Sequence, residues 1–174
     1  NNVRVISATE AISQGAEGIL LESVLEGMAE YYSVELAEKI NRGLTENALK
    51  CKYNGGSLAL GYTTDKEQNY HINPDTAPIV REIFERYKAG MTQGEIAKAL
   101  NNKGLRNQRG TKFNINSIAR ILSNRRYIGE YIYSNTVIPN GIPAIISREL
   151  FDDVQEILAK NKKAPAKHKA EDDY

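Results

Sequence analysis

The sequence has a single cysteine and two histidines among its 174 residues. One thiol cannot form an internal disulfide, and Cys51 with the distant His71 and His168 cannot supply the four ligands of a structural zinc site. No apolar run approaches the roughly 20 residues that a membrane span needs. The opening residues 1–10 do not have the pattern of a signal peptide. We therefore expect a soluble, cytoplasmic protein that needs no metal, cofactor or membrane.

The net charge is close to zero, at +1, but the charges are unevenly distributed along the chain. Residues 1–50 contain 4 basic and 8 acidic side chains, whereas residues 51–138 contain 13 and 7. Residues 101–126 contain no acidic residue, and their basic residues are Lys103, Arg106, Arg109, Lys112, Arg120, Arg125 and Arg126. Like charges repel one another unless an anion offsets them, so this stretch predicts a polyanionic partner.

A long helix is predicted from about residue 16 to residue 50, because this stretch contains no proline and has apolar residues every fourth position. A helix turns by about 100° per residue, so a strict four-residue repeat drifts by roughly 40° at each step. The two halves of the helix should therefore bury against different partners, such as a second subunit or another domain. An ordinary core helix is the alternative. The expected oligomer interface consists of Leu21, Val24, Leu25, Met28, Tyr32, Leu36 and Ile40.

Short strands are predicted at residues 3–8, 63–64 and 70–72, where β-branched and aromatic residues alternate with polar ones. Residues 51–62 have no helical period and contain a glycine pair, which predicts a connector. The connector is interpreted either as a basic strip that follows a DNA minor groove or as a flexible interdomain linker.

Four further helices are predicted from capping signals. Asn73 is expected to cap a helix that ends at Gly90, and Thr92 with Glu95 forms a capping box for the next one. A third helix begins near Asn114 or Asn116, and a last one follows Ser147.

Residues 129–137 alternate like a strand, and residues 144–146 are predicted as its short partner. The expected fold class is α+β and mainly helical. A long N-terminal helix precedes a small helix-turn-helix-like domain with short β hairpins.

In a helix-turn-helix, the second helix presents its exposed face to the DNA major groove. Arginine and asparagine can reach base edges there, and lysine or serine can reach phosphates. The alternative is a solvated, charged face on a small helical domain. The predicted DNA-binding residues are Lys52, Gly55, Gly56, Arg106, Arg109, Lys112, Asn114, Asn116, Ser117, Arg120, Arg125 and Arg126.

The sequence offers no complete active site. None of its serines lies in a nucleophile elbow or beside a histidine base, and the glutamates of the long helix are interpreted as its solvated face. We therefore expect no catalytic residue and no small-molecule substrate.

Four motifs, in this order, resemble the large serine recombinases: MAEYYSVELAEKINRG, GGSLALGY, INPDTAPIVREIFERYKAGMTQGEIAKALNNKG and FNINSIARILSNRRYIGEY. The resemblance implies that residues 1–50 end a catalytic domain, residues 51–62 form a linker and residues 63–160 form the DNA-binding recombinase domain. Residues 161–174 would then be a flexible tail before a zinc ribbon that this chain lacks.

The resemblance also implies a mechanism in which a serine attacks a DNA phosphate and forms a phosphoserine link, while arginines stabilise the transition state. That serine would precede residue 1, so we expect no strand cleavage by this chain. The implied partners are double-stranded DNA and further copies of the chain, as a homodimer and a synaptic tetramer. The implied location is the cytoplasm, in association with the nucleoid.

Two other interpretations stay open. One is a winged helix-turn-helix transcriptional regulator with an oligomerising helix. The other is a helical interaction protein whose basic patch meets an acidic protein surface.

Overall fold

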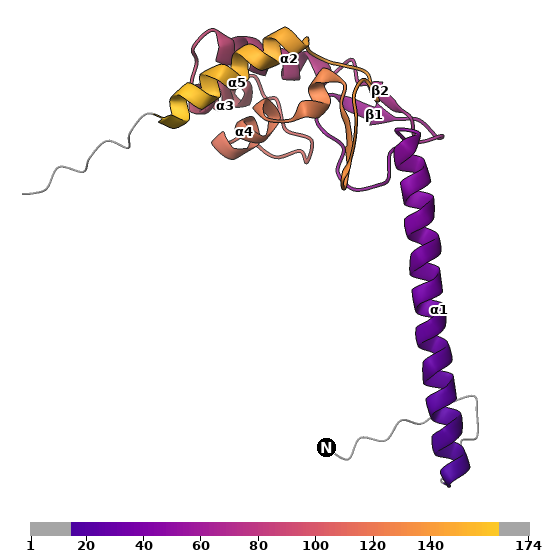
Figure 1. Cartoon of the computed structure of the whole chain (residues 1–174). Coiled ribbons are helices and arrows are strands. Elements are labelled where there is room, and N and C mark those ends of the chain that lie inside the picture. Colours follow the sequence, from indigo (N-terminus) through magenta and orange to yellow (C-terminus); the bar gives the residue numbers. More distant parts are fainter. Residues whose placement is uncertain (1–14, 164–174) are drawn as a thin grey trace, which may run out of the picture. The chain divides into compact units, whose positions relative to one another are not determined.

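The computed structural model describes residues 15–163, and the chain divides into two compact units, residues 1–46 and residues 47–174. Helix α1, Ala16–Leu49, accounts for nearly all of the described part of the first unit (Figure 1). The predicted long helix is thereby confirmed. The strand predicted at residues 3–8 and the tail after residue 163 lie outside the described residues. In the part of the chain that the structure describes, no helix is both long and apolar enough to cross a membrane.

The apolar side chains of α1 lie largely exposed. Leu36 is 59% exposed and Ile40 is 53% exposed. The helix is stabilised locally, because Lys39 forms an ion pair with Glu35 at 2.7 Å and Ser33 donates a hydrogen bond to the Ala29 carbonyl at 2.8 Å. These contacts support the helix itself but leave its apolar surface uncovered within the described residues.

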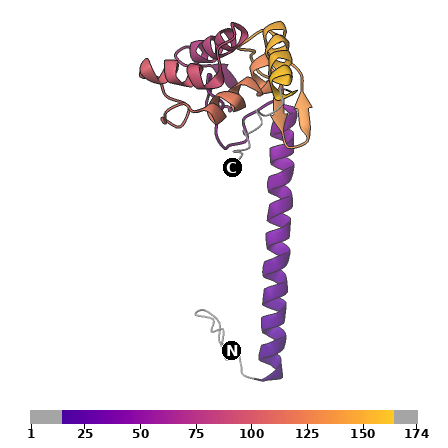
Figure 2. The ribbon, with the colours of Figure 1, turned by 90° about the vertical axis from the view of Figure 1, so that its left-hand side faces the viewer.

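The second unit combines short helices with two hairpins, and its α+β, mainly helical class confirms the expected fold. Its first hairpin pairs β1, Tyr62–Thr64, with β2, Tyr70–Ile72, antiparallel. Its second pairs β3, Tyr131–Tyr133, with β4, Thr136–Ile138, also antiparallel, and Figure 2 shows it in orange. The helices are α2 (Ala77–Lys88), α3 (Gln93–Asn102), α4 (Ile115–Leu122), a 3-10 turn (Arg125–Ile128) and α5 (Arg148–Lys163).

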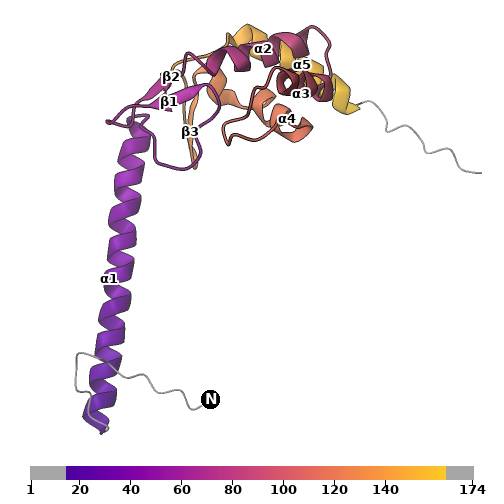
Figure 3. The ribbon, with the colours of Figure 1, turned by 180° about the vertical axis from the view of Figure 1, so that it is seen from behind.

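The helices of this unit surround one hydrophobic core. In Figures 1 and 3, α2 and α5 lie side by side, and α4 lies next to α3. Val80, Ile83 and Phe84 of α2 are fully buried. The centre of the Phe84 ring lies 6.0 Å from the ring centres of both Tyr127 and Phe151. The apolar face of α2 therefore packs into this core.

Three predicted helix caps are also confirmed. The Thr92 hydroxyl accepts from the Glu95 amide, and the Glu95 carboxylate accepts from the Thr92 amide at 2.8 Å, which is a complete capping box. Asn114 caps α4, and the Ser147 hydroxyl accepts from the Leu150 amide at 3.2 Å at the start of α5.

The predicted start of α2 is wrong by three residues. The side-chain oxygen of Asn73 accepts from the backbone amides of Asp75, at 2.9 Å, and Thr76, at 3.3 Å. This closes a turn ahead of the helix, so that Thr76 rather than Asn73 is the N-cap and the helix begins at Ala77.

The prediction for residues 129–146 is also wrong in two respects. The chain reverses within residues 129–137, where Ser134 adopts a left-handed φ of 49°, so this stretch contains both arms of the hairpin. Residues 144–146 form no strand. Instead, the backbone amides of Ile145 and Ile146 both donate to the Tyr127 carbonyl, and both side chains are buried in the core.

Candidate nucleic-acid interface

The end of the α3–α4 loop that precedes α4 is held by the side chain of Asn101, which lies in α3. The side-chain amide of Asn101 donates to the Phe113 carbonyl, and its oxygen accepts from the Phe113 amide, both at 2.8 Å. Phe113 itself is only 4% exposed. This pair of bonds and the buried ring set the position at which α4 begins.

The tip of the same loop is closed by Asn107. Its side-chain oxygen accepts from the amides of Arg109, at 2.9 Å, and Thr111, at 3.1 Å. Its amide nitrogen donates to the Thr111 hydroxyl at 2.7 Å, and Gly110 supplies the left-handed φ of 72° that the turn requires. The Arg109 side chain, exposed to solvent, is therefore carried on an ordered turn.

The start of α4 is held by a second capping box. The Asn114 side chain accepts from the Ser117 amide at 2.8 Å, and the Ser117 hydroxyl accepts from the Asn114 amide at 2.9 Å. The predicted contacts of Asn114 and Ser117 with DNA therefore compete with a structural role at the helix terminus.

Asn116 and Arg120 lie four residues apart on α4 and are exposed on the same side of the helix. Both line a groove of about 460 Å³ together with residues 57–60 of the connector and with Arg109 of the loop. The other residues along this groove are Asn107, Gln108, Thr111, Asn114, Ser117, Ile121, Asn124 and Tyr127. The fold thus brings three separate sequence segments to one groove, in which polar residues outnumber apolar ones.

The cations of residues 101–126 fall into two groups. Arg106, Arg109, Lys112 and Arg120 are exposed, and within residues 15–163 none of them forms an ion pair. These four side chains carry positive charge that the described part of the protein does not neutralise.

The other cations have internal partners. Lys103 pairs with Glu82 at 2.6 Å, and Arg125 binds the carboxylate of Glu130 through two nitrogens, at 2.5 and 2.6 Å. Arg126 donates to the Ile132 carbonyl at 2.7 Å. Acidic residues from outside residues 101–126 therefore neutralise part of the positive charge of this stretch.

Glu130 is the buried member of this ion pair, with 3% of its surface exposed. Hydrogen bonds from Arg125 lower the pKa of Glu130, against the opposing effect of burial, and Arg148 adds a weaker contact at 3.5 Å. The pair links the 3-10 turn after α4 to the residue before β3.

The connector is held against the rest of the unit by tyrosines. The Tyr131 hydroxyl donates to the Lys52 carbonyl at 2.7 Å, and burial raises the pKa of Tyr131 to about 12. The Tyr53 amide donates to the Gln68 carbonyl at 2.8 Å. Gly55 and Gly56 are exposed and have φ angles of 89° and 93°, which favour glycine. The predicted residues Lys52, Gly55 and Gly56 thus lie on an anchored strip, on which both glycines are exposed and Lys52 is half-buried.

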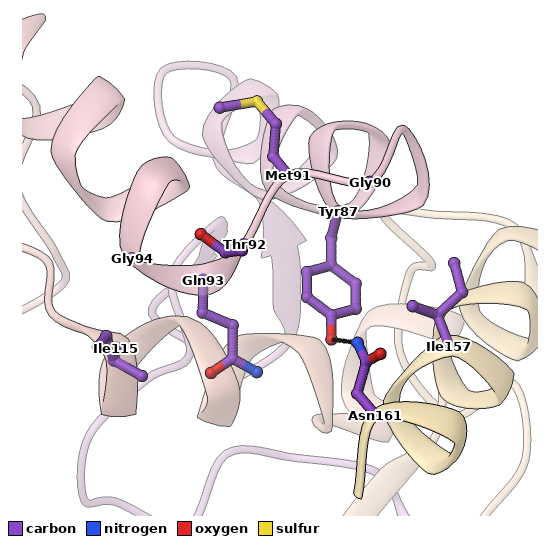
Figure 4. A pocket seen from close by; sticks show the side chains of 9 residues that line it. All are labelled: Tyr87, Gly90, Met91, Thr92, Gln93, Gly94, Ile115, Ile157 and Asn161. Carbon is purple, nitrogen blue, oxygen red and sulfur yellow. Dashed lines mark hydrogen bonds between the residues drawn. The ribbon is translucent and has the colours of Figure 1, made fainter. Parts of the chain in front are cut away.

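A second hollow, of about 590 Å³, lies at the ends of α2, α3 and α5 (Figure 4). The Tyr87 hydroxyl there accepts from the Asn161 side-chain amide at 3.1 Å. Ile115, the first residue of α4, also lines this hollow. No group of three or more potential metal ligands occurs in the described part of the chain.

Sequence reasoning missed Asn101 and Asn107. Asn107 could have been found, because an asparagine three residues before a glycine in a polar loop is typical of a side-chain-closed turn. The contact from Asn101 to Phe113 spans two elements, and nothing in the local sequence signals it.

The loop cations Arg106, Arg109 and Lys112, together with Arg120 on α4, give this small, mainly helical unit an exposed cationic surface. The family model described as Recombinase matches residues 74–161, which is half of the chain. The chain therefore belongs to the recombinase family, and the resemblance to serine recombinases is confirmed.

Two solved structures have a similar fold. A crystal structure of an LSR–DNA complex aligns with a TM-score of 0.60 and 21% identity, covering 73% of this chain and 39% of that one. A structure from work on the sequence requirements of the Listeria innocua prophage attP site aligns with a TM-score of 0.57 and 20% identity, covering 74% and 57%. This chain thus spans well under two thirds of either protein. A comparison with curated proteins gives no match.

Proposed function

We propose that residues 47–163 bind double-stranded DNA and recognise a recombination site for a serine recombinase. Membership of the recombinase family supports this role over that of a transcriptional regulator. Both similar structures concern DNA: one is described as a DNA complex and the other by a prophage attP site. In the whole protein, this region would position a catalytic domain for strand exchange through a phosphoserine intermediate.

The observation that carries the proposal is the groove beside α4. It combines the unpaired cations Arg109 and Arg120 with side-chain amides from the loop and from α4 with its flanking residues, and no acidic residue lines it. Phosphate groups attract such cations, while amides and guanidinium groups can form paired hydrogen bonds with base edges. An acidic protein surface would match the cations but would leave the row of amides without a comparable set of partners.

Different residues of this surface would take different roles. Asn116 and Arg120 lie on the exposed face of α4, where a helix in the major groove reaches base edges. Arg106, Arg109 and Lys112 lie in the loop and would bind phosphates. Arg125 and Arg126 would stabilise the domain instead, because their guanidinium groups already have internal partners.

The anchored strip with Lys52, Gly55 and Gly56 would follow the adjacent minor groove. Glycine leaves room for the backbone to approach the groove floor, since no atom lies within 4 Å of a Cβ added at either glycine. The groove beside α4 includes the next residues of the connector, so the strip and α4 would bind neighbouring parts of one duplex.

The exposed apolar side chains of α1 support a further part of the proposal. Leu21, Val24 and Met28 are each between 44% and 48% exposed, which is costly for a helix that stays alone in water. We propose that this surface, with Leu25, Tyr32, Leu36 and Ile40, binds further copies of the chain as a dimer and, with synapsed sites, as a tetramer.

The test is equilibrium binding of the whole chain to a labelled duplex, followed by fluorescence anisotropy. Arg120→Ala should weaken binding to the selected site about tenfold, within the range of 1–3 kcal/mol for a base-reading arginine. Arg106→Ala and Arg109→Ala should weaken binding to every duplex to a similar extent, as expected for phosphate contacts. Lys88→Ala is the matched control, because Lys88 is an exposed cation of α2 that pairs with Asp153 on α5. Unchanged affinity in all three variants, or an equal loss in Lys88→Ala, would contradict the proposed interface.

A further inference from the structure

The aliphatic residues of α4 differ sharply in burial. Ile118, Ile121 and Leu122 are at most 8% exposed and complete the face of the helix that packs on the core. Ile115 is 58% exposed and belongs neither to the core nor to the apolar residues packed around it. An exposed isoleucine at the first position of this helix therefore has no structural role in the core.

The surroundings of Ile115 are mixed. It lines an open hollow of about 510 Å³ with the polar residues Lys98, Asn101, Asn114 and Asn116 and with Gly94, Ala97 and Phe113. On its other side it lines the hollow that contains Tyr87, Met91 and Ile157. Its Cδ1 atom lies 3.9 Å from the position of a Cβ added at Gly94, so the start of α3 offers it only light cover. Amides and a cation thus lie beside an apolar side chain that the described part of the protein leaves exposed.

The same surroundings fit the major groove of a duplex. The groove presents base-edge donors and acceptors, phosphates at its rims, and one apolar group, the C5-methyl of thymine. The N-terminal residues of a recognition helix are those that reach base edges. Ile115 occupies the first position of α4, and Asn116, next to it, also lines the groove beside the connector.

We infer that Ile115 is a specificity-determining residue that packs against the C5-methyl group of a pyrimidine in the recombination site. The inference rests on the proposed DNA-binding function and adds a residue to it. Thymine and 5-methylcytosine both carry this methyl group. The experiment below determines which of the two bases Ile115 contacts.

The experiment starts by enriching duplexes from a randomised pool with the whole chain. Each thymine of the selected site is then replaced by deoxyuridine, which removes only the methyl group, and binding to wild type and to Ile115→Ala is measured. At one thymine, we expect deoxyuridine to weaken wild-type binding about fourfold, the scale for one buried methyl-sized group. The same replacement should leave Ile115→Ala unaffected, and Ile115→Val should give an intermediate loss.

A second arm replaces each cytosine of the site by 5-methylcytosine. A methyl-dependent gain in wild type that Ile115→Ala lacks would support the inference with methylcytosine as the base. Val137→Ala is the control, because Val137 of β4 is 55% exposed and lies outside α4. It should not change the response to the methyl group that Ile115 reads. Thermal unfolding of Ile115→Ala should match wild type, since the side chain is exposed.

The outcomes separate the two proposals. If the chain binds no duplex, the proposed function fails. If it binds and selects a site, but every methyl group matters equally to wild type and Ile115→Ala, only the inference about Ile115 is overturned. Binding without any sequence selection would overturn it as well.

Discussion

Apolar side chains are largely exposed on helix α1 but largely buried in the second unit. In the second unit, the aliphatic and aromatic residues of α2 point into one core, and Val80 and Phe84 are completely buried. In α1, side chains of the same kinds, such as Leu36 and Ile40, remain more than half exposed. The hydrophobic effect stabilises burial by roughly 25 cal/mol for each Å² of apolar surface, so the first set stabilises the folded unit while the second favours association.

We attribute the stability of the fold mainly to the second unit and, as proposed above, self-association to α1. The second unit closes its core within residues 47–163, and its surface is left free to bind a charged partner. Helix α1 forms from local contacts, yet apolar side chains such as Leu36 and Ile40 remain exposed within the described part of the chain.

The largest effect that sharpens this comparison is expected from core truncation. Phe84→Ala should lower the free energy of unfolding by about 3–5 kcal/mol, because it leaves a cavity between Tyr127 and Phe151. Met28→Ala removes a side chain that is 47% exposed and should change it by less than about 0.5 kcal/mol. Urea unfolding followed by tyrosine fluorescence measures both. A comparable loss of unfolding free energy in the two variants would contradict the difference in burial between α1 and the second unit.

Charges on α1 should reduce self-association. Leu36→Glu with Ile40→Glu places two carboxylates on the exposed apolar surface, and we expect at least a tenfold weaker association constant by sedimentation equilibrium, or about 1.4 kcal/mol. Exchange of Glu38 for glutamine is the control on the same helix. An unchanged association constant in the double variant would show that α1 is not the oligomer interface.

Loss of the buried carboxylate should give the next effect. Glu130→Gln removes a charged acceptor from Arg125, and we expect about 1.5–3 kcal/mol of destabilisation at neutral pH, the usual value for hydrogen bonds to charged groups. Glu67→Gln, in the exposed turn between β1 and β2, should have little effect.

The same pair predicts a pH dependence. The pKa of Glu130 is lower in the folded protein than in the unfolded chain, so its stabilising contribution is complete above the unfolded value of about 4.3. That contribution is lost as the pH falls through the folded pKa. Urea unfolding below about pH 5 should therefore show a steeper loss of stability in wild type than in Glu130→Gln. Parallel curves would contradict the ion pair.

The smallest effect is expected from the loop tip. Asn107→Ala removes the acceptor for the amides of Arg109 and Thr111, and we expect a two- to fivefold loss of DNA affinity through a less ordered Arg109. Gln108→Ala, at the adjacent exposed position, controls for loss of an amide without loss of the turn. A greater effect in Gln108→Ala would show that direct contact matters more than the order of the loop.

Local signals predicted much of the fold. Thr92 with Glu95 determines its own capping box, and Asn114 with Ser117 does the same at α4, because every partner lies within one helical turn. Asn73 misled the prediction because both it and Thr76 are acceptable caps, and only the turn that closes between them decides which residue is the cap.

The candidate site was predictable only in part. The exposed cations Arg109 and Arg120 stand out in an acid-free stretch, but the partner of Arg125 comes from outside that stretch. The alternation of residues 129–137 continues through the turn at Ser134, so periodicity alone could not show that the chain reverses there. Contacts with acidic residues outside residues 101–126 decided which charges are neutralised.

The most direct measurement of the central claim is the salt dependence of DNA binding. The logarithm of the affinity falls linearly with the logarithm of salt concentration, with a slope of about 0.9 for each neutralised phosphate. We predict that replacing Arg106, Arg109 and Lys112 together by alanine makes this slope shallower by about 2 to 3, whereas Lys88→Ala leaves it unchanged. An identical slope in wild type and the triple variant would show that these cations do not bind phosphate and would contradict the account.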